Sequence, residues 1–135
     1  MKKQGILNSS LSRIIASMGH TDRLVICDSG LPIPRSAETV DLALTANIPR
    51  FIDTLRAVLG EGCFESAVVA AEMEKQNPRV FAELKGLLGG MQVKAVPHEE
   101  FKRLSADGAT STAFVRTGEA TPYANVILVS GVTFD

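Results

Sequence analysis

Apolar residues recur along the chain with two different periods, and together these periods predict alternating helices and strands. Spacings of three and four residues, typical of one face of a helix, mark segments 11–18, 48–59 and 80–88. A shorter helix is expected at 98–104. Short continuous or alternating apolar runs predict strands, which we place at 24–27, 40–44, 67–71, 92–96, 112–116 and 125–129. Because the two kinds of element alternate, we expect the α/β fold class: a single compact domain over residues 1–135, with a largely parallel central sheet flanked by helices.

The expected helices begin and end at residues with known capping preferences. Ser9 or Ser10 can cap the first helix, and Gly19 is expected to end it in the left-handed conformation that glycine tolerates. Asn77 followed by Pro78 predicts the start of a later helix, with the asparagine as the capping side chain and the proline in the first helical position.

The charge balance and composition exclude several classes of protein. The 14 basic and 15 acidic residues give a formal charge of −1, so we expect no nucleic-acid partner and no polybasic membrane anchor. Hydrophobic residues make up 45% of the chain and charged residues 21%, which indicates a globular protein. Cys27 and Cys63 lie far apart, and no apolar run has the length of a membrane helix. We therefore expect a soluble, cytoplasmic protein.

Sequence motifs for the common cofactors are missing. The chain has no Walker A loop and no G-x-S-x-G elbow, and the segment Gly60–Glu61–Gly62 lacks the third glycine and the preceding strand of a dinucleotide fingerprint. The two histidines and two cysteines are too widely separated along the chain to form a metal-ligand motif. We expect neither a metal ion nor a cofactor.

Polar residues at the ends of predicted elements are the candidates for a functional site. Asp28 follows a buried strand, at the edge where α/β sheets usually bind ligands, and His20 and His98 lie at helix ends. Tyr123 and Asn125 flank the start of the last strand. Ordinary roles account for these residues equally well, since aspartate forms turns and tyrosine packs in cores. The hydrophobic pattern and the residue types therefore predict an α/β domain with a candidate polar pocket, and no particular activity.

Four motifs, taken together, resemble the D-ribose pyranases of the ribose pyranase and fucose mutarotase family. They are Gly19–His20–Thr21–Asp22, the segment 27–34 (CDSGLPIP), Arg116–Thr117–Gly118–Glu119 and Pro122–Tyr123–Ala124–Asn125. The resemblance implies a cofactor-free isomerase that interconverts the pyranose and furanose forms of D-ribose by acid–base catalysis. It places the catalytic histidine at His20. It places sugar-contacting residues at Asp28, His98, Tyr123, Ala124 and Asn125, with Lys102 near the pocket.

The same resemblance carries expectations about specificity and assembly. Fucose mutarotases typically have glycine after the catalytic histidine and Tyr-Gly-Asn near the end, so Thr21 and Ala124 favour ribose over L-fucose. The resemblance also implies a ring-shaped homo-oligomer, a decamer, with pockets near subunit contacts. Two alternatives stay open: an L-fucose-type mutarotase and a non-catalytic sugar-binding sensor. His20 counts against the sensor, because binding alone needs no acid–base group.

Overall fold

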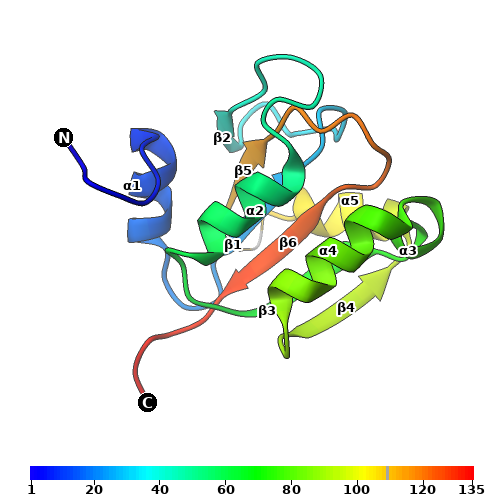
Figure 1. Cartoon of the computed structure of the whole chain (residues 1–135). Helices are drawn as coiled ribbons and strands as arrows, with labels where there is room; N and C mark the ends of the chain where they lie inside the picture. The colour runs from blue at the N-terminus through cyan, green and yellow to red at the C-terminus, as the bar shows by residue number, and fades with distance from the viewer. Residues whose placement is uncertain (109) are drawn as a thin grey trace.

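The structure is a computed structural model that describes residues 1–108 and 110–135. Within these residues a six-stranded mixed sheet has the strand order β2-β5-β1-β6-β3-β4 (Figure 1). The strands are β1 (Arg23–Cys27), β2 (Glu38–Asp41), β3 (Phe64–Ala70), β4 (Gln92–Val96), β5 (Thr112–Arg116) and β6 (Val126–Ser130). The expected α/β fold with a largely parallel sheet is confirmed.

Strand β6 is the exception to the parallel arrangement, because it pairs antiparallel with both β1 and β3. The other neighbouring strands are parallel to one another. We call the edge of the sheet where β1 to β5 end the carboxyl edge, and the opposite edge the amino edge. Since β6 runs the other way, it begins at the carboxyl edge and ends at the amino edge.

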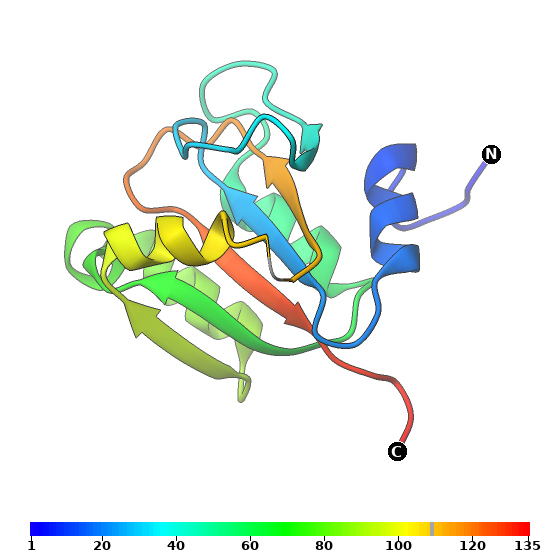
Figure 2. The ribbon, with the colours of Figure 1, turned by 180° about the vertical axis from the view of Figure 1, so that it is seen from behind.

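Helices cover both faces of the sheet. They are α1 (Ser9–Ser17), α2 (Phe51–Leu59), α3 (Glu72–Gln76), α4 (Pro78–Leu88) and α5 (His98–Ser105). Leu24 and Ile26 of β1 belong to the larger core, which contains buried residues of α1, α2 and α4. Val25 belongs to the smaller core, which contains the fully buried Phe101 of α5. Figure 2 shows α5 on the face of the sheet opposite α2 and α4. The alternation along β1 therefore divides its side chains between two apolar layers, as a strand with period two requires.

Several predicted boundaries need correction. The first helix is capped by Asn8, whose Oδ1 accepts the Leu11 N–H at 2.9 Å, and not by a serine. The helix ends before Gly19 as expected, but the left-handed residue in this loop is Thr21, with φ of 70°. The glycine N–H instead donates to the Asp22 carboxylate, so a side chain organises this turn.

Two later helices also differ from expectation. Helix α2 begins at Phe51, and Ile48, expected on its buried face, is 52% exposed in the preceding loop. Asn77 does precede α4, but its side chain makes no capping bond and is used elsewhere. Helix α3 was not predicted, and β2 begins before the expected segment 40–44. None of the helices in the described residues is long and apolar enough to cross a membrane.

Candidate active site

The carboxyl edge collects most of the predicted site residues from distant parts of the chain. Asp28 directly follows β1, and His98 lies just after β4, at the start of α5. Tyr123, Ala124 and Asn125 directly precede β6. They reach the same edge only because β6 is antiparallel to its neighbours. The topology thus brings together segments separated by about a hundred residues.

Asp28 and Asn125 are joined by two hydrogen bonds. The Asp28 backbone N–H donates to Asn125 Oδ1 at 2.9 Å, and Asn125 Nδ2 donates to Asp28 Oδ2 at 3.2 Å. Asp28 Oδ1 also accepts the N–H groups of Gly30 and Leu31, each at 2.9 Å. Asp28 therefore forms a turn and also presents a carboxylate oxygen at the site. Asn125, only 1% exposed, fixes the position of that carboxylate.

The protonation of Asp28 is controlled by opposing effects. Burial raises the pKa of the Asp28 carboxyl, because a buried charge loses its hydration. The hydrogen bonds from Gly30, Asn125 and Leu31, and the nearby His98, lower that pKa and offset part of the rise. The result is a pKa above the ordinary 3.8 for this carboxyl.

His98 and Tyr123 form an aromatic wall beside this carboxylate. Their rings meet edge to face, with centroids 5.0 Å apart and an interplanar angle of 83°. The His98 backbone N–H donates to both oxygens of Glu72, at 3.1 and 3.0 Å, which fixes the start of α5. His98 Nδ1 is buried and has no hydrogen-bond partner within residues 1–108 and 110–135. Tyr123 has a φ of 59°, an uncommon conformation for a bulky residue, and such strain clusters at functional sites.

Lys102 and Ala124 lie near the site, but the Lys102 ammonium group is paired elsewhere and the Ala124 side chain is buried. Lys102 is one turn beyond His98, and its Nζ pairs with Glu99 at 2.7 Å in an open groove along the loop 32–34. The Ala124 side chain is fully buried in the larger core. Its methyl group therefore contributes to the packing of this core.

His20 lies at the opposite, amino edge of the sheet. It is in the loop between α1 and β1, where the Thr21 N–H donates to the carbonyl of Ser130 at the end of β6. Its Nε2 is 3.0 Å from Glu65 Oε2, at the start of β3. Strand β1 separates His20 from Asp28 and spans about 13 Å, at roughly 3.3 Å per residue. Within a single chain, His20 therefore lies too far from the other predicted site residues to act on the same sugar.

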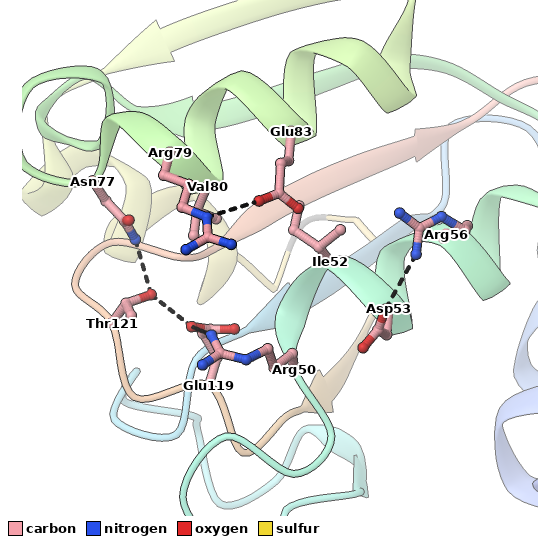
Figure 3. Close-up of a pocket in the computed structure, with 10 residues that line it drawn as sticks. All are labelled: Arg50, Ile52, Asp53, Arg56, Asn77, Arg79, Val80, Glu83, Glu119 and Thr121. Carbon is pink, nitrogen blue, oxygen red and sulfur yellow. Dashed lines mark hydrogen bonds and ion pairs between the residues drawn. The ribbon is translucent and has the colours of Figure 1, made fainter.

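A buried polar network that the sequence did not reveal supports the loop carrying Tyr123 (Figure 3). Glu119, 1% exposed, accepts from the Phe51 N–H at 3.0 Å, from the Thr121 hydroxyl at 2.7 Å and from Arg50 at 3.3 Å. Asn77 Nδ2 donates to Thr121 Oγ1 and to the Pro122 carbonyl, both at 2.9 Å. The network ties the starts of α2 and α4 to the β5–β6 loop. The only available signal was that Glu119 lies in one of the four motifs.

The pocket beside this network, about 370 Å³, is lined by none of the predicted site residues. Its three arginines are each paired with an acidic side chain: Arg50 with Glu119, Arg56 with Asp53, and Arg79 with Glu83. Across the described part of the chain, no three His, Cys, Asp or Glu side chains come together in a way that could hold a metal ion.

Comparison with known proteins agrees with the motifs. The model of the RbsD / FucU transport protein family matches residues 1–133. A D-ribose pyranase from Coprothermobacter proteolyticus is 54% identical over 134 residues, covering 99% of this chain and all of the relative. A D-ribose pyranase from Laribacter hongkongensis is 52% identical over 134 residues, which again cover 99% of this chain and all of the relative.

Solved structures extend the agreement to three dimensions. Bacillus subtilis RbsD complexed with D-ribose superimposes with a TM-score of 0.92 at 43% identity, covering 99% of this chain and 100% of the other. The fucose mutarotase of Streptococcus pneumoniae in complex with L-fucose gives a TM-score of 0.78 at 21% identity, covering 95% of each chain, and shows a shared fold. The family resemblance is thereby confirmed, and the chain belongs to the RbsD / FucU family.

Proposed function

We propose that this protein, as one domain over residues 1–135, is an isomerase that interconverts the pyranose and furanose forms of D-ribose. One observation carries the proposal: a partly buried carboxylate, an imidazole and a tyrosine meet at the carboxyl edge, in a chain whose near relatives are D-ribose pyranases. Carboxylates accept hydrogen bonds from sugar hydroxyls, and aromatic rings pack against the apolar face of a sugar.

The reaction needs a group that both takes up and releases a proton. Ring opening removes the proton of the anomeric hydroxyl, breaks the bond between C1 and the ring oxygen, and protonates that oxygen. The hydroxyl on C4 then adds to the C1 aldehyde, loses its proton, and the aldehyde oxygen is protonated. An imidazole exchanges protons in both directions near neutral pH, and positioned acid–base catalysis typically contributes about 10²- to 10⁴-fold in rate. This chemistry requires no metal ion and no cofactor.

The side chains divide this work according to their positions. His20 is the catalytic acid and base, and Asp28 accepts hydrogen bonds from sugar hydroxyls. His98 and Tyr123 form the wall against the sugar. Asn125 holds Asp28 and keeps a second N–H for the sugar. Lys102, one turn beyond His98 on α5, and the backbone of Ala124, between Tyr123 and Asn125, complete the set of proposed sugar contacts.

We infer from the position of His20 that the site is shared between two copies of the chain. Proton transfer requires His20 within about 3 Å of the sugar, which its own chain does not allow at the carboxyl edge. The groove of about 400 Å³ around His20 is lined by Val132 and Phe134, which are 40% and 74% exposed. An exposed apolar rim of this kind is typical of an interface. A second copy that presents its carboxyl edge to this groove completes the site.

Contacts between unlike edges propagate from copy to copy, and they close a ring where the rotation between neighbouring copies divides a full turn. The proposed assembly is therefore a ring-shaped homo-oligomer, and the family resemblance gives its size as a decamer. The two free thiols, one buried and one exposed, are suited to the reducing cytoplasm, where we place the protein.

Saturation-transfer NMR of a D-ribose solution tests the activity directly. We expect protein to accelerate exchange between pyranose and furanose signals, undiminished by a chelator, and to act more slowly on L-fucose. Unchanged exchange despite measurable ribose binding would favour the sugar-binding sensor. Faster exchange of L-fucose would favour the mutarotase.

A further inference from the structure

His20 is paired with a carboxylate that neither the motifs nor the proposed reaction had assigned. We infer that Glu65 is a positioning residue: it holds the imidazole through Nε2 and leaves Nδ1 as the nitrogen that exchanges protons with the sugar. This inference rests on the proposed catalytic role of His20. The pair is geometrically well formed, with 3.0 Å between Nε2 and Oε2.

Hydrogen-bond chemistry explains why the pair selects one tautomer. A neutral imidazole carries one N–H, on either nitrogen, and an ionised carboxylate can only accept. When Glu65 binds Nε2, the hydrogen must be on Nε2 and the lone pair on Nδ1. The same bond restrains the rotation of a ring that is 53% exposed. A base must be held in one tautomer and one orientation to act efficiently.

The backbone around Glu65 is irregular in a way that serves this contact. The pairing of β3 with β6 shifts register between Phe64 and Ser66, so that Glu65 is the extra residue of a β-bulge. Bulges re-aim a side chain and are over-represented beside active sites. Gly131 faces the bulge, and a Cβ atom there would lie 3.3 Å from the Glu65 Cβ. A glycine opposite the bulge leaves the room in which Glu65 turns towards His20.

The other acidic groups around His20 are engaged elsewhere. Asp22, in the same loop, accepts the Gly19 N–H at 2.8 Å. Glu61, on the rim of the groove, accepts the Ile6 N–H at 2.6 Å and pairs with Lys2 at 3.4 Å. Cys63, which also lines the groove, directs its thiol to the Val132 carbonyl. Glu65 is thus the carboxylate whose bond reaches the imidazole.

Long-range ¹H–¹⁵N NMR of the full chain tests the assignment, because the chain has two histidines and His20→Ala identifies the signals of one. At alkaline pH, where imidazoles are neutral, we expect Nε2 of His20 to appear protonated and Nδ1 unprotonated. Glu65→Met keeps the volume but removes the acceptor, so the ¹⁵N shifts should move to those of a tautomer mixture. Glu65→Gln keeps an acceptor oxygen and should restore the shifts.

Activity provides the second readout. In Glu65→Met we expect the ribose exchange rate to fall roughly tenfold with little change in ribose affinity, and Glu65→Gln to recover most of it. Glu83→Ala removes a comparably exposed glutamate on α4 and should change neither measurement. Parent-like ¹⁵N shifts in Glu65→Met would overturn the inference, whatever the activity. A parent without ribose exchange would overturn the proposed function, and the ¹⁵N shifts would still decide the role of Glu65.

Discussion

Complementation between two inactive variants tests the shared site most directly. His20→Ala removes the proposed acid–base group at the amino edge, and Asp28→Ala removes the proposed sugar ligand at the carboxyl edge. Each variant alone should lose most exchange activity. If each site takes His20 from one copy and Asp28 from another, oligomers containing both variants regain some sites with both groups intact.

The size of the recovery follows from counting subunits. In an equal, random mixture, half of the copies supply an intact His20 and half supply an intact Asp28. About a quarter of the sites then have both, so mixed oligomers should show about a quarter of the parent activity. If both residues of a site came from one chain, no site would be restored.

Co-expression of the two variants, purification of the mixed oligomer and saturation-transfer NMR with D-ribose give the measurement. A mixture of the parent with the double variant His20→Ala/Asp28→Ala is the control: a shared site predicts about a quarter of parent activity, and a single-chain site about a half. Chromatographic size must match the parent, since Asp28→Ala also removes the acceptor of two N–H groups in the turn. Properly assembled mixtures without recovery would refute the shared site.

Three further predictions concern the carboxyl edge. Burial raises the pKa of Asp28 above that of an unfolded aspartate, so the proton on this carboxyl stabilises the fold at acid pH, and that stabilisation is lost as pH rises through the raised pKa. In urea denaturation, Asp28→Asn should therefore gain stability relative to the parent over that pH rise. A stability difference that does not change with pH would contradict this. Asn77→Ala should lower the free energy of unfolding by about 1–3 kcal/mol and weaken ribose binding, because Thr121 and Pro122 lose their hydrogen-bond donor. If calorimetry shows an unchanged ribose affinity, the Asn77 network does not support sugar binding. Ala124→Gly should lower the free energy of unfolding by about 1 kcal/mol, because the Ala124 methyl group packs in the core. For the same reason the ratio of ribose to fucose exchange rates should stay unchanged. A shifted ratio would show that this methyl group shapes the sugar site.

The hydrophobic pattern predicted the strands better than their directions. An apolar run such as 125–129 reads the same in a parallel and in an antiparallel strand, so the orientation of β6 could not be predicted from periodicity. Asp28 was found because the end of a buried strand is visible in the sequence. The separation of His20 from Asp28 was also implied, since an extended strand lies between them, but a motif match does not measure distance.

Residues whose side chains bind partners far away in the sequence left no usable pattern. Glu65 was missed because a bulge changes which way a strand residue points, and alternation cannot show a bulge. Glu119 caps α2 from a loop far along the chain, and Asn77 has the residue type of a cap but binds the β5–β6 loop. In each case the partner is distant in sequence, so local propensity carries no information about it.

Strand β6 fixes how far apart the two edges of one subunit lie. At one end the residue that precedes it, Asn125, holds Asp28, and at the other its last residue, Ser130, binds the backbone of the loop that carries His20. A strand in the middle of a sheet can neither stretch nor slip by one residue, because a slip exchanges the two faces. The length of β6 therefore fixes the distance between Asp28 and the His20 loop within one subunit. In the proposed ring, where each copy would contribute one edge to each of two neighbouring sites, this distance would have to match the contacts with both neighbours. Changes of chain length can be accommodated in loops, whereas one residue added to β6 would shift the His20 loop relative to Asp28 and would, in the proposed ring, disturb both sites to which the subunit contributes.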